Sequence, residues 1–405
     1  MNAAPEPATG TGRLECLGGE TIGVVGAGMM GAALAYTCAR AGADVVLVGR
    51  TVDGARRGVA YASHREARAR TTDSAVSRAL LDRITPTDRL ADLEPASLVV
   101  EAVPENVVVK QQVMRSVEAV THEGTVLAST TSTLPITTLS SALTRAEALV
   151  GMHFFSPVDR MPLVEVIAGA RTSEAVFTTA LDYARMLGKT PIVVRDSRGF
   201  FTSRVMERYL DEALTAVGEG VDPDVVERAA TAAGYPVPPL RLLDEISLTL
   251  NRAVQRENRT AVEAVGGTWQ GTSADRVRDR LIDDHDRGGR SVGRGFYDYD
   301  VDGSRIGLWP GLHEVFGTRR TIQLDDMRDR LMFVQAVEAL RCLDEGVVGS
   351  DDDADTGSVL GIGFPARTGG VVSFVRSYPG GADRFAARAR ELADRYGVRF
   401  LPPHR

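Results

Sequence analysis

The amino-acid sequence predicts an α/β protein: a Rossmann-type doubly wound sheet followed by an all-α C-terminal region with a duplicated helical module. Three observations support this fold class. Short apolar segments alternate with helical patterns over residues 21–194, a glycine-rich turn follows the first segment, and helical patterns dominate after residue 196. Such alternation is typical of a mainly parallel sheet whose strands are joined by helices.

The chain begins with residues 1–18, whose Ala, Pro, Gly and Thr content without periodicity predicts a disordered tail. An apolar strand is expected at residues 21–25, an Ala-rich helix at 32–41 and a second strand at 44–48. This order of strand, turn, helix and strand is the context in which a G-x-G-x-x-G motif binds a dinucleotide. We therefore expect an NAD(P)-binding domain over residues 19–196.

The glycine-rich turn between the first strand and the helix reads Gly26-Ala27-Gly28-Met29-Met30-Gly31. Gly26 permits a tight turn, Gly28 lets a pyrophosphate approach the backbone, and Gly31 lets the helix pack closely on the strand. The N-terminus of the helix also attracts the anion. The predicted cofactor contacts of this turn are Gly26, Gly28, Met29, Met30 and Gly31.

The end of the second strand bears on the choice between NAD and NADP. An NAD site usually has Asp or Glu there to bind the ribose hydroxyls, and that carboxylate would repel a 2′-phosphate. Here the residues are Gly49-Arg50-Thr51, so the acid is missing and an Arg with a hydroxyl follows. The sequence favours NADP, bound by Arg50 and Thr51. The alternative is that Arg50 stacks on the adenine while NAD binds.

Later strands are expected at residues 98–103, 125–129, 149–152, 164–166 and 189–194. Because ligands bind at the carboxyl ends of the strands in such sheets, the polar residues that follow these strands are candidate site residues. They are Glu105, Lys110, Thr130, Ser132 and His153. Lys110 also stands out because it and Lys189 are the only lysines in a chain that otherwise uses Arg.

Residues 52–92 are expected to be helical and carry a cluster of arginines. Its members include Arg56, Arg57, Arg65, Arg68 and Arg70. Guanidinium groups match phosphate oxygens well, so the cluster is a hint of a phosphate-rich substrate such as coenzyme A. The alternative is a solvated helix face.

His153 and Glu165 form the strongest candidate for catalysis. A His with a pKa near neutrality can take a proton from an alcohol or return it to a carbonyl, and a carboxylate beside it can hold the useful tautomer. The pair therefore suits the interconversion of alcohols and ketones. The alternative is a His at a strand end with an unrelated surface Glu.

The C-terminal half contains an internal duplication. Glu212-Ala213-Leu214, Glu219-Gly220-Val221 and Gly234-Tyr235-Pro236 recur in order as Glu338-Ala339-Leu340, Glu345-Gly346-Val347 and Gly363-Phe364-Pro365. Two copies of one helical module explain this recurrence. We expect the first module at residues 197–300 and the second at 301–405.

Composition narrows the class of protein. The formal net charge of −7 argues against nucleic acid held by a general basic surface. The three cysteines are widely scattered without metal-ligand spacing, so we expect a reduced compartment and no metal. Because there is also no long apolar run and no secretory signal pattern, the sequence predicts a cytoplasmic protein without a membrane span.

Taken together, these motifs resemble the L-3-hydroxyacyl-CoA dehydrogenase family over about residues 20–400. The shared motifs are the glycine turn, Val100-Glu101-Ala102-Val103, Thr131-Ser132, Gly151-Met152-His153-Phe154-Phe155-Ser156-Pro157, Leu163-Val164-Glu165-Val166 and Gly188-Lys189-Thr190-Pro191. Residues 293–299 and the second helical copy resemble the dehydrogenase portion of the fatty-acid oxidation complex alpha subunit, without its hydratase portion.

The resemblance implies reversible oxidation of a 3-hydroxyacyl thioester to the 3-ketoacyl thioester, with hydride transfer to NAD or NADP. It implies that His153 is the general base or acid and that Glu165 supports it. Ser132 would donate a hydrogen bond to the substrate oxygen. Glu105 and Lys110 would lie along the nicotinamide ribose.

Some residues depart from the family's pattern. Ser203 stands where the family has a catalytic-site Asn, so its hydroxyl either substitutes for that amide or leaves the site impaired. Thr130 replaces another Asn beside the cofactor, and Pro238 replaces a Gly near the expected acyl pocket. These changes leave open an acyl-carrier-protein thioester or an unusual short hydroxy acid as substrate. A non-catalytic dinucleotide-binding scaffold is a further alternative.

The duplication also bears on assembly. The resemblance implies that members with one helical module pair two subunits through it. In this chain the second copy would take the place of the partner. A monomer is therefore expected to be possible beside a homodimer.

Overall fold

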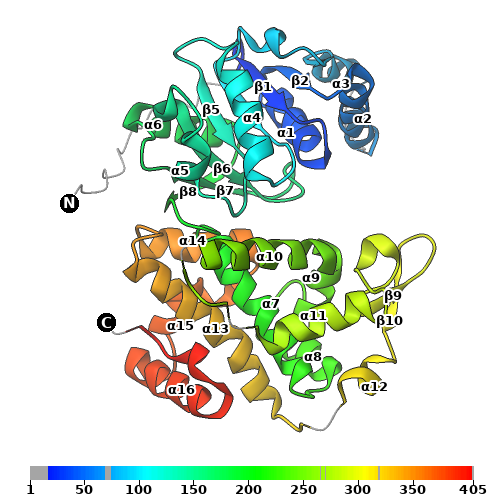
Figure 1. Ribbon diagram of the computed structural model, residues 1–405, viewed down its shortest axis with the longest axis vertical. Helices are drawn as coiled ribbons and strands as arrows, with labels where there is room; N and C mark the ends of the chain where they lie inside the picture. Colours follow the sequence, from blue (N-terminus) through cyan, green and yellow to red (C-terminus); the bar gives the residue numbers. More distant parts are fainter. Residues whose placement is uncertain (1–16, 69–73, 265, 270, 318–319, 404–405) are drawn as a thin grey trace. The chain divides into compact units, whose positions relative to one another are not determined.

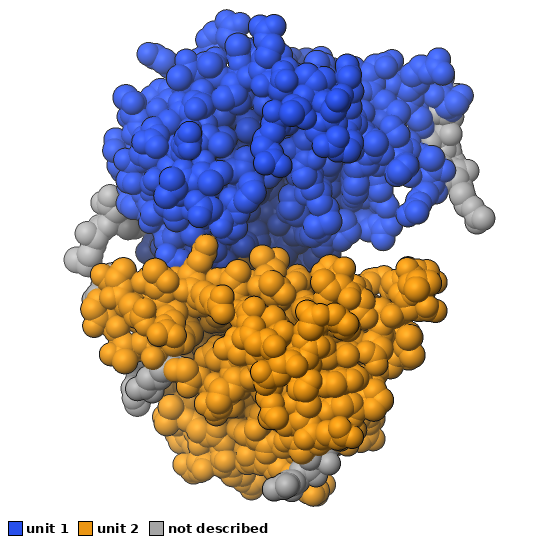
Figure 2. Space-filling view, turned by 45° about the vertical axis from the view of Figure 1, so that its right-hand side comes forward, with its two compact units in different colours: residues 1–201, 346–361 blue, residues 202–345, 362–405 orange. Residues whose placement is uncertain are grey.

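The computed structural model describes residues 17–68, 74–264, 266–269, 271–317 and 320–403. Most of the predicted tail and Arg70 lie outside these residues. The chain forms two compact units (Figure 2): unit 1 holds Met1–Phe201 and Gly346–Gly361, and unit 2 holds Thr202–Glu345 and Ile362–Arg405. The units thus divide after Phe201, and a short segment of the expected second helical module belongs to unit 1.

Unit 1 is built on an eight-stranded sheet with the order β3-β2-β1-β4-β5-β6-β7-β8. The strands are β1 (Thr21–Val25), β2 (Asp44–Val48), β3 (Ile84–Thr87), β4 (Leu98–Glu101), β5 (Val126–Ser129), β6 (Leu149–Phe154), β7 (Leu163–Ala168) and β8 (Thr190–Arg195). All neighbouring strands are parallel except β6 and β7, which are antiparallel. The predicted Rossmann-type doubly wound sheet is confirmed.

Helices accompany this sheet in unit 1 (Figure 1). They are α1 (Met29–Arg40), α2 (Val52–Arg68), α3 (Ser74–Leu81), α4 (Val107–Glu118), α5 (Ile136–Ser140), α6 (Glu174–Met186) and most of α14 (Asp351–Ile362). Short 3₁₀ turns are η1 (Leu90–Leu93) and η2 (Ala146–Ala148). Val100 of β4 packs into the core with residues of α1 and α6, and its neighbour Val99 is equally buried outside that cluster. Both faces of the strand are therefore covered, which explains why it is apolar without alternation.

Strand β3 was not expected, because its residues fall in the segment predicted to be helical. Its sequence is Ile84-Thr85-Pro86-Thr87, and it pairs only with β2 at the edge of the sheet. Pro lacks an amide donor and is tolerated in a sheet mainly at such an edge. A four-residue edge strand with a central Pro carries too little apolar patterning to be distinguished from a loop.

Unit 2 is mainly helical, as predicted. Its helices are α7 (Thr202–Gly218), α8 (Pro223–Ala233), α9 (Pro239–Ile246), α10 (Leu248–Ala264), α11 (Ser273–Asp283), α12 (Leu312–Phe316), α13 (Leu324–Asp344), α15 (Val371–Arg376) and α16 (Gly381–Tyr396). The 3₁₀ turns are η3 (Arg290–Val292), η4 (Ala366–Thr368) and η5 (Val398–Phe400). A small antiparallel hairpin of β9 (Tyr297–Tyr299) and β10 (Arg305–Leu308) interrupts the helices. Among the described residues, no helix is both long and apolar enough to cross a membrane.

The duplicated triplets lie at equivalent places in the order of the helices and turns. The turn after α7 contains Gly220 with a positive φ of 84°, and the turn after α13 contains Gly346 with a φ of 69°. Helices α8 and α14 are likewise followed by Gly234 and Gly363, with φ of 97° and 69°. Glycine adopts this left-handed conformation without steric cost, so the repeated glycines mark the same turn geometry in both copies.

Candidate active site

The glycine-rich turn leaves open space at one glycine. A Cβ on Gly26, which has a φ of 112°, would lie 2.5 Å from the carbonyl oxygen of Ala102. A Cβ on Gly31 would lie 1.7 Å from the carbonyl oxygen of Gly26. Gly28 instead has an ordinary φ of −73°, and no atom lies within 4 Å of its Cβ position. Neither conformation nor packing explains this glycine, whereas close approach of a pyrophosphate does.

The start of α1 follows directly on this space. Gly28 is its N-cap, and Met29 and Met30 form its first turn, with Met29 exposed. A helix N-terminus attracts an anion because its first amide groups point outward without intrahelical partners. The local geometry therefore fits a dinucleotide, and the individual contacts of these residues stay predictions.

The end of β2 has no room for an acidic side chain at residue 49. A Cβ on Gly49 would lie 2.8 Å from the amide nitrogen of Ala55 and 2.9 Å from the carbonyl oxygen of Thr51. Arg50 is exposed. The hydroxyl of Thr51 accepts a hydrogen bond from the amide of Gly54 at 3.1 Å, at the start of α2.

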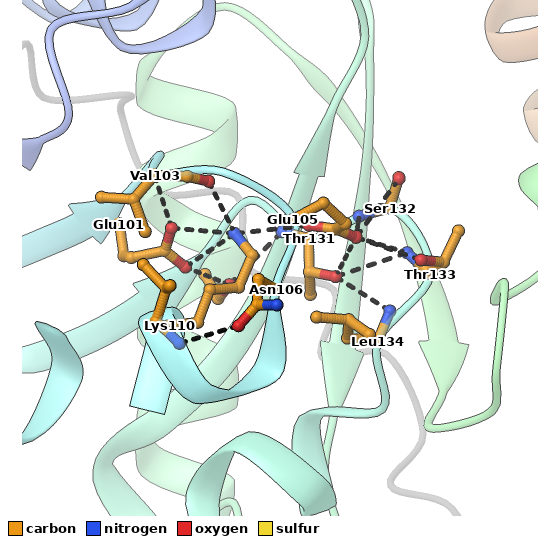
Figure 3. A network of polar contacts seen from close by, with 11 residues as sticks. Glu101, Val103, Glu105, Asn106, Lys110, Thr131, Ser132, Thr133 and Leu134 are labelled. Atoms are coloured by element: carbon orange, nitrogen blue, oxygen red, sulfur yellow. Dashed lines mark hydrogen bonds and ion pairs between the residues drawn. The ribbon is translucent and has the colours of Figure 1, made fainter. Parts of the chain in front are cut away.

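A buried ion pair links β4 to α4 (Figure 3). Glu101, at the end of β4, is 0% exposed, and Lys110 of α4 is 1% exposed. The ammonium of Lys110 donates to both carboxylate oxygens of Glu101, at 2.8 and 3.0 Å, and to the carbonyl of Val103 at 3.2 Å. Ser129, at the end of β5, donates to the same carboxylate at 2.6 Å. The ends of two neighbouring strands are thereby tied together.

Glu105 extends this network to the loop after β5. One carboxylate oxygen lies 3.4 Å from the ammonium of Lys110. The other accepts hydrogen bonds from the hydroxyl of Thr131 at 2.6 Å and from the amides of Ser132 and Thr133 at 3.0 and 3.2 Å (Figure 3). Burial alone would raise the pKa of Glu105, but Lys110 and these hydrogen bonds lower it below its ordinary value. Glu105 is therefore an anion that holds the loop.

Three of the predicted site residues meet in this network: Glu105, Lys110 and Ser132. Thr130 lies beside them, and its amide donates to the carbonyl of Glu101 at 3.0 Å. Glu101 is not among the predicted site residues. The available signal was a carboxylate in an otherwise apolar strand, followed by one of only two lysines in the chain.

His153 and Glu165 face each other on neighbouring strands. They are direct partners in the antiparallel register of β6 and β7, and Nδ1 of His153 lies 2.6 Å from Oε2 of Glu165. Glu165 is 0% exposed and His153 is 7% exposed, so Glu165 is not a surface residue. The other carboxylate oxygen of Glu165 accepts from the amide of Phe201 at 3.2 Å.

This geometry sets the chemistry of the imidazole. A tautomer protonated at Nδ1 donates to Glu165 and leaves Nε2 as the acceptor for a substrate proton. The ring is also flanked by Phe155 and Phe200, with centroids at 4.6 and 6.2 Å. Phe200 has a φ of 48°, an uncommon conformation for a bulky side chain.

The second lysine also holds a loop by its ammonium. Lys189 donates to the carbonyl oxygens of Val158 and Met161, the latter at 2.8 Å, in the connection between β6 and β7. Burial lowers the pKa of Lys189. Both lysines therefore donate to backbone carbonyls of a loop.

Ser203, the remaining predicted site residue, lies in the first turn of α7 in unit 2. Its catalytic role stays a prediction. Within the described residues, no group of three or more His, Cys, Asp or Glu side chains is arranged to hold a metal ion.

Two family models match the chain. The NAD binding domain of 3-hydroxyacyl-CoA dehydrogenase matches residues 21–197, and the C-terminal domain of the same enzyme matches residues 199–299. Together they cover the sheet of unit 1 and the first helical module.

Solved structures agree with these matches. A 3-hydroxybutyryl-CoA dehydrogenase from Escherichia coli K12 is similar in fold, with a TM-score of 0.79 and 24% identity over 95% of this chain and 96% of its own. (S)-3-hydroxybutyryl-CoA dehydrogenase PaaH1 from Ralstonia eutropha is 31% identical over 69% of this chain and 99% of its own, with a TM-score of 0.64. FadB2 from M. tuberculosis is 30% identical over 69% and 98%, with a TM-score of 0.62. The chain therefore belongs to the 3-hydroxyacyl-CoA dehydrogenase family and is a dehydrogenase that uses a nicotinamide dinucleotide.

Proposed function

We propose that this protein interconverts 3-hydroxyacyl and 3-ketoacyl thioesters, with His153 as the general base or acid. The observation that carries this proposal is the buried pair of His153 and Glu165, whose ring nitrogen and carboxylate oxygen are 2.6 Å apart. Family membership supports an acyl-CoA as the thioester.

In the oxidation, Nε2 of His153 takes the proton of the substrate hydroxyl while the hydrogen on the same carbon leaves as hydride. When bound, the nicotinamide supplies the hydride acceptor in this direction and the hydride donor in the reverse direction. The carboxylate of Glu165 stabilises the imidazolium that forms and fixes the ring orientation. In the reduction, the imidazolium returns the proton to the developing alkoxide.

Ser132 is proposed to donate a hydrogen bond to the substrate oxygen. Its amide is held by Glu105 at 3.0 Å, whereas its hydroxyl lies 3.5 Å from the same carboxylate oxygen. A contact of 3.5 Å is at the outer limit of hydrogen-bond distance, so it is weak. The backbone of Ser132 is thus fixed by Glu105, which favours pre-organised binding of the substrate oxygen. Ser203 is proposed to add a second hydroxyl to the site.

NADP is the proposed preferred cofactor. Gly49 stands at the end of β2, and the packing around it leaves no space for the carboxylate that would bind the ribose hydroxyls of NAD. Arg50 follows and is exposed. The guanidinium group attracts a 2′-phosphate, and a missing carboxylate removes the repulsion.

An acyl-carrier-protein thioester or an unusual short hydroxy acid is the second candidate substrate. Pro238 is the N-cap of α9 and Pro239 is its first residue, so two prolines fix the backbone at the start of this helix. With Thr130 and Ser203, this departure from the family's pattern favours a changed substrate. Faster turnover of an ordinary acyl-CoA than of the corresponding carrier-protein thioester would remove this candidate.

The test of the main proposal is oxidation of NADPH or NADH by the purified protein on addition of acetoacetyl-CoA. His153→Ala should lower the rate roughly 100- to 10,000-fold, because general acid catalysis is lost. It should leave cofactor binding, followed by nicotinamide fluorescence, unchanged. His122→Ala, at an exposed position, is the matched control. An unchanged rate in His153→Ala would show that this His is not the acid.

A further inference from the structure

The turn between β2 and α2 carries two guanidinium groups that lack an acidic partner. Neither Arg50 nor Arg57 forms an ion pair with any residue in the part of the chain that the structure describes, and both are exposed. Arg56, which directly precedes Arg57 in α2, differs from both because it pairs with Asp53 at 3.1 Å. Arg56 is thus neutralised locally, whereas Arg50 and Arg57 are available to an anion.

Gly54 leaves space beside one of these groups. A Cβ at this residue would lie 3.3 Å from the hydroxyl oxygen of Thr51 and 3.7 Å from a terminal nitrogen of Arg57. The guanidinium of Arg57 therefore reaches back along α2 toward Thr51, one turn nearer the end of β2. The side-chain space of Gly54 lies between this nitrogen and the hydroxyl.

The backbone of Gly54 does not have a positive φ, and the hydroxyl oxygen of Thr51 is the one atom that a Cβ there would approach closely, at 3.3 Å. Gly58, one turn later, is different, because a Cβ there would lie 2.9 Å from a side-chain carbon of Leu47. Gly54 is therefore less tightly packed than Gly58, and its missing side chain leaves the exposed Thr51 and Arg57 open to an anion.

We propose that Arg57, together with Arg50 and the space over Gly54, forms the subsite for the 2′-phosphate of NADP(H). The inference rests on the proposed use of NADP and adds a second guanidinium and the glycine that gives it access. Two guanidinium groups can bind a phosphate dianion through several charge-assisted hydrogen bonds. Asp53 is the carboxylate of this turn that would repel the phosphate, and its ion pair with Arg56 weakens that repulsion.

The test compares 2′,5′-ADP with 5′-AMP, two ligands that differ only in the 2′-phosphate, by titration calorimetry of the full chain. The wild-type protein should bind 2′,5′-ADP more tightly. Arg57→Ala should weaken binding of 2′,5′-ADP about 10- to 100-fold, as expected for the loss of charged hydrogen bonds, and leave 5′-AMP binding unchanged. Arg68→Ala is the matched control, since it removes an exposed charge near the end of the same helix, and it should behave as wild type.

Two results would overturn the subsite. One is equal binding of 2′,5′-ADP and 5′-AMP by the wild-type protein, and the other is an effect of Arg57→Ala no larger than that of Arg68→Ala. The dehydrogenase proposal is judged separately by turnover of acetoacetyl-CoA with either cofactor. A protein that turns over this substrate with NADH and ignores the 2′-phosphate keeps its reaction and loses the subsite. A protein that distinguishes the 2′-phosphate through Arg57 but does not turn over acetoacetyl-CoA keeps the subsite and loses the proposed reaction.

Discussion

The buried pair of Glu101 and Lys110 shows how individual side chains prepare the site. A buried ion pair contributes little net stability, because desolvation of both charges offsets their attraction. Its hydrogen bonds are directional, however. Glu101 and Lys110 fix the position of Glu105, which in turn holds the backbone of Ser132. The pair is therefore best understood as a device that positions the loop after β5.

Removing only the ammonium should be more harmful than removing both charges. Lys110→Met leaves the fully buried Glu101 without its cation, and we expect a loss of roughly 3–5 kcal/mol in the free energy of unfolding. The double variant Glu101→Gln with Lys110→Met should recover much of this loss, because no charge remains uncompensated. Urea unfolding followed by circular dichroism measures both. A double variant less stable than Lys110→Met would contradict this account.

Glu165 should affect the rate without affecting cofactor binding. Glu165→Gln preserves the size of the side chain but removes the charge that stabilises the imidazolium of His153, so kcat should fall roughly 100-fold. Steady-state kinetics with acetoacetyl-CoA and a fluorescence titration of the cofactor separate the two effects. Glu123→Gln, at an exposed position, serves as the control. A weakened cofactor affinity with unchanged kcat would assign Glu165 to binding instead.

Two buried acids of unit 2 fasten the segment before and within β9 to its helices. Asp244 of α9 accepts hydrogen bonds from the amides of Phe296 and Tyr297 at 2.7 and 2.9 Å. Glu227 of α8 accepts from the amide of Leu240 at 2.8 Å and from the hydroxyl of Tyr297. The motif at residues 293–299 is therefore explained by structure: it closes the first helical module against α8 and α9.

Gly295 should not tolerate a side chain. A Cβ at this residue would lie 1.9 Å from a carboxylate oxygen of Asp244, so Gly295→Ala must displace the carboxylate from its amide donors. We expect a loss of more than about 2 kcal/mol in the free energy of unfolding. Gly307→Ala is the matched control, because no atom lies within 4 Å of its Cβ position. Equal midpoints of urea unfolding for the two variants would disprove the proposed contact.

Glu227 should make the stability of unit 2 depend on pH. Burial raises its pKa to about 7 from the ordinary 4.5, despite the hydrogen bond from Tyr297. The folded protein thus favours the neutral carboxyl. The resulting stability is fully present below about pH 4.5 and is lost as the pH rises through about 7.

Glu227→Gln isolates this effect, since the amide stays neutral at every pH. The stability of the wild type relative to this variant should fall by about 3 kcal/mol between pH 4.5 and 8, at about 1.4 kcal/mol per pKa unit. Urea unfolding at both pH values measures the difference. Glu263→Gln, an exposed position on α10, should show no such trend. A constant difference between wild type and Glu227→Gln would place the pKa of Glu227 near its ordinary value.

An element could be predicted from the sequence where its pattern lies within a short segment. It could not be predicted where it depends on contacts with residues far along the chain. The glycine turn and the apolar strands are local patterns, and the sheet they predict is confirmed. The edge strand β3 is defined by its pairing with β2, which a Pro-containing tetrapeptide does not reveal. The central position of Glu101 was missed for the same reason, because its partners come from α4 and β5.

The two helical copies are joined by reciprocal ion pairs within unit 2. Arg204 of α7 binds Glu338 of α13 at 2.7 Å, and Arg330 of α13 binds Glu212 of α7 at 2.6 Å. Arg330 also lies 3.1 Å from Glu219, as Arg204 binds Glu345. All these residues occupy matching positions in the duplicated sequence. The recurrence of the triplets therefore records an interface between α7 and α13 that is nearly symmetric.

This internal interface leads to a prediction about assembly. In an isologous dimer both subunits use the same surface. A contact of residue i in one subunit with residue j in the other is therefore repeated with the subunits exchanged. In this chain α7 and α13 already provide both halves of such a contact, with Arg330 and Glu212 both 0% exposed. A second chain is not needed to cover α7, so we expect the protein to remain a monomer. Light scattering coupled to size exclusion should give the mass of one chain at every loading concentration.

A variant that weakens the contact between α7 and α13 tests the same prediction. Arg330→Glu places a carboxylate against Glu212 and should destabilise the pairing of α7 with α13, because two buried like charges repel. Apolar residues in the contact between α7 and α13 would then become exposed, and association of chains is expected. Arg328→Glu, on the exposed side of the same helix, should leave the protein monomeric. A wild-type dimer that persists on dilution would show that the second copy does not replace a partner subunit.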